Sequence, residues 1–208
     1  MIQMAENANN HPPYFTNAAF DIVAIAASAG GVTALIKVLS TLPAEFTAAI
    51  AIVQHLPRQY PSLMAEILNW HTAISVKQAE EGDILTPGTA YIAAPNHHLL
   101  VNGDGTLSLS QSESVRFLRP SADLLFESVA ATYKNRAIAI VLTGTGSDGT
   151  IGVEAIKKMG GTVIVQDIET AEFSGMPSAV IQSGNVDFIL PLNKISPTLV
   201  TLVMGECD

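Results

Sequence analysis

Short continuous apolar runs alternate along this chain with segments whose apolar side chains recur every three or four residues. The runs are bounded by Gly, Pro or polar residues, which is typical of strands covered on both faces. They fall at 22–27, 48–54, 74–77, 90–94, 137–142, 162–166 and 186–190. Helical spacing is found at 31–40, 62–70, 121–133 and 150–159. The alternation predicts a doubly wound α/β fold, in which a mostly parallel sheet carries helices on both faces.

Residues 90–110 depart from this alternation. They contain the turn sequence Asn102-Gly103-Asp104-Gly105 between two apolar stretches, which predicts a small antiparallel hairpin. The first 19 residues lack periodicity and are expected to form a mobile lead-in. We therefore expect one folded domain over 20–195, followed by a C-terminal helix or tail over 196–208.

Composition narrows the possible functions. The 208 residues are 48% hydrophobic and 14% charged, as expected for a folded domain, and no apolar run is long enough for membrane insertion. The net charge of −9, with scattered Lys and Arg, disfavours nucleic-acid binding. The start of the chain lacks the pattern of a secretory signal, and Cys207 is the single cysteine. These features favour a cytoplasmic location.

Three chemically useful side chains follow three of the predicted strands. Ser28 follows the run at 22–27, His55 follows 48–54, and Asp148 lies in the loop after 137–142. Because the carboxyl ends of parallel strands meet at one edge of a sheet, we expect these residues to lie near one another. Serine, histidine and aspartate are the side chains of a nucleophilic hydrolase.

Their expected roles follow from that chemistry. His55 would take the proton of Ser28, and Asp148 would orient the imidazole and stabilise its charged form. The glycine-rich turn after Ser28 would expose backbone N–H groups to an oxyanion, as would the second glycine-rich loop. The candidates for this oxyanion pocket are Ala29, Gly30, Gly31, Gly144, Thr145 and Gly146.

Each of these residues also has a simpler interpretation. Ser28 could cap the helix that follows it, or its turn could cradle a phosphate. His55 could be an ordinary loop histidine, and Asp148 could be the N-cap of the helix at 150–159. Near 119–123, Ser121 could cap a helix and Asp123 would suit its positive end.

No metal or cofactor is predicted. The adjacent His97 and His98 should point to opposite sides of a strand, and His71 is far from them in the sequence. The chain also lacks the GxGxxG pattern and the GK[ST] ending of the common nucleotide-binding loops.

Six ordered sequence blocks resemble the catalytic domain of the chemotaxis protein-glutamate methylesterase (CheB) family. They span roughly residues 20–192 and read AIAASAGG, VQHLP, YIAAPNHHLLV, RPSADLLFESVA, VLTGTGSDGT and VQDIETAEFSGMPSAVI. The resemblance implies hydrolysis of glutamate γ-methyl esters on methyl-accepting chemotaxis receptors, with release of methanol, and deamidation of receptor glutamines. It carries the family triad onto Ser28, His55 and Asp148.

The resemblance also has departures. Ala29 stands where many chemotaxis members have threonine, and Thr145 where they have methionine. With these residues the two motifs resemble the subgroup in which the catalytic domain stands alone or is fused to a methyltransferase, without the receiver domain. The implied partners are the chemotaxis receptors as substrate and a chemoreceptor methyltransferase or separate regulator. Hydrolysis of another small ester and a non-catalytic docking role in a chemosensory complex stay open as alternatives.

Overall fold

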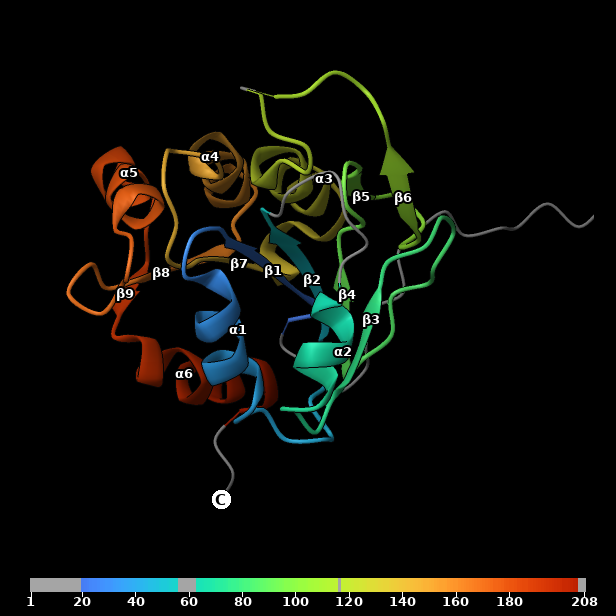
Figure 1. Ribbon diagram of the computed structural model, residues 1–208, viewed down its shortest axis with the longest axis horizontal. Coiled ribbons are helices and arrows are strands. Elements are labelled where there is room, and N and C mark those ends of the chain that lie inside the picture. The colour runs from blue at the N-terminus through green and yellow to red at the C-terminus, as the bar shows by residue number, and fades with distance from the viewer. Residues whose placement is uncertain (1–19, 56–62, 116, 206–208) are drawn as a thin grey trace, which may run out of the picture.

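A computed structural model describes residues 20–55, 63–115 and 117–205, and its centre is a parallel β-sheet (Figure 1). The strand order is β3-β4-β2-β1-β7-β8-β9, and every pairing in this sheet is parallel. The strands are β1 (Ile22–Ala27), β2 (Ala49–Gln54), β3 (Ser75–Gln78), β4 (Thr89–Ile92), β7 (Ala137–Val141), β8 (Thr162–Gln166) and β9 (Phe188–Leu190). The expected α/β fold is confirmed.

Helices cover both faces of the sheet, and each face has its own apolar core. The first face carries α1 (Gly31–Leu39), α2 (Met64–Asn69) and α6 (Leu192–Met204); the second carries α3 (Ala122–Tyr133), α4 (Thr150–Lys158) and α5 (Gly175–Ser183) (Figure 1). Along β1, Val23 and Ile25 pack on the first side, whereas Ala24 and Ala26 pack on the second. Burial of successive residues on opposite faces explains why these strands are continuously apolar.

The separate hairpin lies beside α3. It consists of β5 (His98–Val101) and β6 (Leu107–Ser110), which pair antiparallel, and its turn is closed by a hydrogen bond from the Gly105 N–H to the Asn102 carbonyl of 2.9 Å. The hairpin was predicted within 90–110. The first strand of that stretch, β4, instead joins the large parallel sheet.

Two helices near the C-terminus were less visible in the sequence. No helix was predicted at α5, which begins at a glycine and has Pro177 near its start, where proline is tolerated. Helix α6 begins at Leu192, so the boundary expected between 195 and 196 falls inside it. Ile195, Leu199 and Val203 of α6 are buried in the core beneath the sheet. The lead-in predicted at 1–19 lies outside the described residues.

The sheet has a topological switch point between β1 and β7. From β1 the chain moves first to β2 on one side, and returns at β7 on the other. Ligands of open parallel sheets bind beyond the carboxyl ends of the strands at such a point. Ser28 follows β1 and Thr143 comes shortly after β7, so both lie at this position.

Candidate active site

His55 and Asp148 lie in direct contact at the carboxyl edge of the sheet. His55 Nε2 is 2.9 Å from Asp148 Oδ2, although the residues are 93 positions apart in the sequence. The side chain of Asp148 is 2% exposed and that of His55 is 12% exposed. Because Asp148 engages Nε2, the other ring nitrogen, Nδ1, is the one that can accept a proton from a nucleophile.

The carboxylate of Asp148 is held by a set of donors from the start of α3. It accepts hydrogen bonds from Ser121 Oγ at 2.9 Å, the Ala122 amide at 2.7 Å and the Asp123 amide at 3.2 Å. Burial alone would raise the pKa of Asp148, but the bonds from His55 and these amides outweigh it and hold the pKa below its ordinary value. Asp148 is therefore the ionised partner that a charged imidazole needs.

Two aspartates bind the N-termini of α3 and α4 in a crossed arrangement. Asp148 binds the N-terminus of α3, while Asp123 accepts hydrogen bonds from the Ile151 and Gly152 amides at the start of α4, at 3.0 and 2.9 Å. The alternative in which Asp148 caps its own following helix is wrong, because Gly149 occupies that N-cap position. Ser121 does occupy the N-cap position of α3, as expected, but its hydroxyl donates to Asp148 and makes no cap bond to its own helix.

Ser28 sits at the start of a tight turn between β1 and α1. The Gly31 N–H donates to the Ser28 carbonyl at 2.9 Å, and Gly30 between them has a φ of +73°, a left-handed conformation that favours glycine. Ser28 is not the N-cap of α1, since Gly30 holds that position. No hydrogen bond within the described residues reaches Ser28 Oγ, and catalytic hydrogen bonds often tighten only when substrate binds.

The loop after β7 lies against this turn. The Ser28 N–H donates to the Thr143 carbonyl at 3.0 Å, and Thr143 Oγ1 donates to the Ala29 carbonyl at 3.0 Å. A Cβ on Gly144 would lie 2.8 Å from Ser28 Cβ and 2.3 Å from Met176 Sδ. The absence of a side chain at Gly144 is therefore what allows this loop to approach the serine so closely.

The six residues expected to line the oxyanion pocket separate into two groups. The N–H groups of Gly31 and Gly144 are already used, by the Ser28 carbonyl and by the Phe173 carbonyl at 2.9 Å respectively. They hold the loops together instead of facing an oxyanion. The remaining candidate donors to an oxyanion are the backbone amides of Ala29, Gly30, Thr145 and Gly146.

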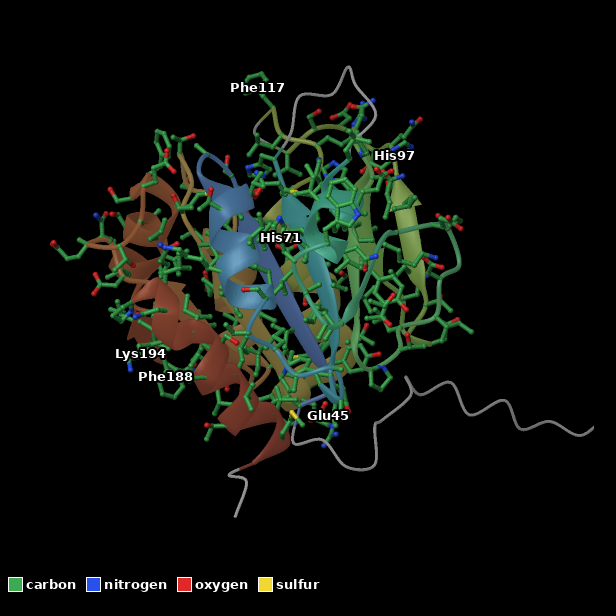
Figure 2. The ribbon with its side chains drawn as sticks, turned by 60° about the horizontal axis from the view of Figure 1, so that its bottom comes forward. Glu45, His71, His97, Phe117, Phe188 and Lys194 are labelled. Carbon is green, nitrogen blue, oxygen red and sulfur yellow. The ribbon has the colours of Figure 1, made fainter. Side chains whose placement is uncertain are left out.

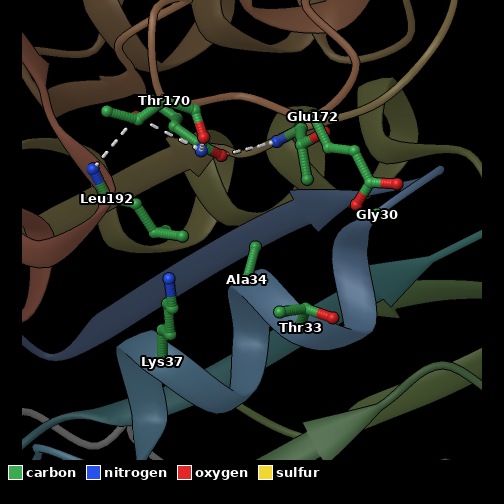
Figure 3. A pocket seen from close by; sticks show the side chains of 9 residues that line it. Gly30, Thr33, Ala34, Lys37, Thr170, Glu172 and Leu192 are labelled. Carbon is green, nitrogen blue, oxygen red and sulfur yellow. Dashed lines mark hydrogen bonds between the residues drawn. The ribbon is translucent and has the colours of Figure 1, made fainter.

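A cavity of about 170 Å³ opens on the α1 side of the Ser28 turn (Figure 3). Lys37 and Thr33 of α1 line it from one wall, and Glu172 and Thr170 line it from the other. Gly30 and Thr143 form its boundary with the Ser28 turn. The candidate active site therefore adjoins a cavity that carries both a cationic and an anionic side chain.

Among the described residues, the histidines other than His55 do not come together as a metal centre. His71 and His97 lie well apart (Figure 2), and His98 is buried, where its Nδ1 accepts a hydrogen bond of 3.1 Å from the Ser121 amide. Across 20–55, 63–115 and 117–205 no group of three or more His, Cys, Asp or Glu side chains could hold a metal ion. None of the helices in the same part of the chain is long and apolar enough to cross a membrane.

A residue that the sequence did not single out joins the two halves of the site. Gln54 ends β2, and its Nε2 donates to the carbonyls of both Ser28 and His55, at 2.8 and 3.0 Å. In the sequence it looks like the polar end of an apolar strand. Only its position between the two loops distinguishes it.

A serine, a histidine and a buried aspartate gathered at the carboxyl edge of a parallel α/β sheet are typical of the serine hydrolases. Comparison with known proteins gives the family. The model of the family described as CheB methylesterase matches residues 23–199, so this chain belongs to that family.

Relatives and a solved structure agree with this membership. A protein-glutamate methylesterase/protein-glutamine glutaminase of Geobacillus kaustophilus is 43% identical over 189 residues, covering 89% of this chain and 54% of its own. A Leptospira interrogans protein provisionally named for the same two activities is 40% identical over 189 residues, covering 91% of this chain and 98% of its own. The crystal structure of the Thermotoga maritima CheB methylesterase catalytic domain superposes with a TM-score of 0.85 at 38% identity, covering 88% of this chain and 98% of that one.

Proposed function

We propose that this protein hydrolyses γ-methyl esters of glutamate on methyl-accepting chemotaxis receptors, releases methanol, and deamidates receptor glutamines. The observation that carries the proposal is the His55–Asp148 pair beside Ser28 in a chain of the CheB methylesterase family. The names of the relatives, which give both activities, support the same substrates. The proposal includes a cytoplasmic location, which the single cysteine favours.

The proposed reaction assigns one step to each side chain. Ser28 Oγ attacks the ester carbonyl while His55 Nδ1 takes its proton, and Asp148 stabilises the imidazolium through Nε2–H. His55 then gives the proton to the leaving methoxide, so that methanol departs and an acyl-enzyme remains. A water molecule, activated by His55, releases the glutamate carboxylate and restores Ser28. With an amide substrate the same steps release ammonia.

The test is methanol release from receptor-containing membranes that carry labelled methyl esters. We expect Ser28→Ala to lower kcat by several orders of magnitude, because the triad acts as a unit. Ser174→Ala is the matched control, since this exposed serine immediately precedes α5 and makes no side-chain cap bond. It should keep full activity.

Three results would overturn the proposed function. Unchanged release by Ser28→Ala would exclude the proposed nucleophile. No release by the wild-type protein, with hydrolysis of a chromogenic acetate ester that depends on Ser28, would identify an esterase for another substrate. No Ser28-dependent activity on either would leave the docking role.

A further inference from the structure

We propose that Gln54 is a positioning residue that fixes the backbone of the nucleophile relative to the backbone of the base. This inference rests on the proposed function, because it gives Ser28 and His55 those roles. Gln54 itself would touch neither substrate nor reacting atoms. It would act by holding the two loops at the separation that proton transfer requires.

The side chain of Gln54 links β1 and β2 just beyond their last backbone hydrogen bond. Strands β1 and β2 are neighbours at the centre of the sheet (Figure 1), and their final backbone bond runs from the His55 N–H to the Ala27 carbonyl at 3.1 Å. Beyond it, Gln54 Nε2 donates to the Ser28 carbonyl on one side and to the His55 carbonyl on the other. One amide group therefore bridges the backbones of both proposed catalytic residues.

The orientation of the Gln54 amide is fixed by its partners. Carbonyl oxygens only accept hydrogen bonds, so the NH₂ group must face them, and its two N–H bonds match the two carbonyls. The Ser28 carbonyl also accepts from Gly31, which places two donors on the carbonyl of the nucleophile. A carboxylate or an apolar side chain of similar size could not supply this pair of donors.

The bridge made by Gln54 Nε2 leaves the other polar atom of this side chain, Oε1, without a hydrogen bond from the described residues. Gln54 is 4% exposed, and its Oε1 is buried and has no hydrogen-bond partner among the residues that the structure describes. A buried acceptor without a partner costs free energy, which an apolar side chain in the same space would avoid. Space filling alone therefore does not account for a glutamine at this position.

Gly31 makes room for the Gln54 side chain. A Cβ on Gly31 would lie 2.1 Å from Gln54 Oε1 and 2.8 Å from Ala27 Cβ. Glycine is therefore needed at the two positions for different reasons. Gly30 adopts a left-handed backbone conformation, and Gly31 leaves space for the side-chain amide of Gln54. The turn and the glutamine depend on each other.

The proposed effect of this bridge is on the rate of the chemical step. The direction of the His55 ring is set by Asp148, which engages Nε2, but its distance from Ser28 depends on the two strand ends. A displacement of about 1 Å between reacting groups can cost a factor of about 100 in rate. Loss of the bridge should therefore lower kcat and leave KM nearly unchanged.

The experiment compares two variants on a chromogenic acetate ester, which needs the triad but no receptor. Gln54→Met keeps the volume and removes both donors, and we expect kcat to fall about 10- to 100-fold at every pH. Gln54→Glu keeps the shape; its protonated form can donate one hydrogen bond, whereas its ionised form faces two carbonyl oxygens. We expect its kcat to fall as pH rises and the glutamate ionises, a descending limb that the wild-type profile lacks.

A distant core variant controls for loss of stability. Val203→Ala truncates a buried side chain of α6 away from the site, and it should lower the melting temperature without changing kcat or the pH profile. Variants are compared at a temperature where circular dichroism shows each of them folded. If Gln54→Met does not fold, the pH profile of Gln54→Glu against wild type decides the question.

The outcomes separate the inference from the proposed function. Wild-type kcat in Gln54→Met, or a Gln54→Glu profile without the descending limb, would overturn the role of Gln54. Activity on the acetate ester that survives Ser28→Ala would instead overturn the triad. Activity on the acetate ester without receptor demethylation would overturn the proposed substrate and leave Gln54 testable.

Discussion

The two halves of the candidate active site are built in opposite ways. Asp148 accepts five hydrogen bonds, from His55, Ser121, Ala122, Asp123 and Gly149. In contrast, the Ser28 hydroxyl receives none from the described residues, and Ser28 is fixed only through its backbone. The proposed base and its carboxylate partner are therefore assembled before substrate arrives, whereas the proposed nucleophile keeps a rotatable side chain on a rigid turn.

This difference suggests where substitutions should act. Changes around Asp148 should affect both stability and catalysis, because its donors also join α3 to the loop after β7. Changes around Ser28 should affect catalysis through the shape of the turn. Four variants or conditions test this contrast, beginning with the largest expected effect.

Asp148→Asn should lower kcat on the acetate ester about 10⁴-fold, since the amide cannot stabilise an imidazolium or hold the ring in its useful tautomer. Asp187→Asn is the matched control, because Asp187 pairs with Lys157 on the surface. A loss of less than tenfold in Asp148→Asn would show that the preassembled pair is not catalytic.

Gly144→Ala should lower kcat about 100-fold by pushing Ser28 away from the loop after β7. It should also reduce the free energy of unfolding by about 1–3 kcal/mol, as expected for overpacking. Gly103→Ala is the control, because nothing lies near its added Cβ. An unchanged kcat in Gly144→Ala would mean that the reaction tolerates a displacement of Ser28.

Ser121→Ala removes one donor to the buried carboxylate of Asp148. We expect a loss of about 1.5–3 kcal/mol in the free energy of unfolding, measured by urea denaturation, and a kcat about tenfold lower. Ser178→Ala on α5 should change neither quantity. A lower kcat with an unchanged free energy of unfolding would contradict the view that the hydrogen bonds to Asp148 support both catalysis and stability.

The smallest effect concerns acid stability. Because the pKa of Asp148 is lowered from 3.8 on folding, its contribution to stability is present above pH 3.8 and is lost as pH falls below that value, through the folded pKa. The difference in unfolding free energy between wild type and Asp148→Asn should therefore shrink over this range. A difference independent of pH would show that Asp148 gains no stabilisation as an anion.

Much of the fold was visible in the sequence because both faces of the strands are buried. The bounds of β1 and β8 match the apolar runs at 22–27 and 162–166. Helix α5 was missed, since a glycine start and Pro177 hide a short amphipathic segment. Its existence depends on packing Met176 and Val180 against the face of the sheet that α3 and α4 also cover, a contact that no local pattern encodes.

The sequence by itself determined the position of the candidate residues at strand ends, because a parallel sheet aligns those ends at one edge. Only the tertiary structure decided how they are held. The crossed caps of Asp148 and Asp123, the hydroxyl of Ser121 and the bridge of Gln54 join segments from 26 to 29 residues apart. Such hydrogen bonds depend on how helices and loops pack after the chain has folded, and residue type or periodicity carries no record of them.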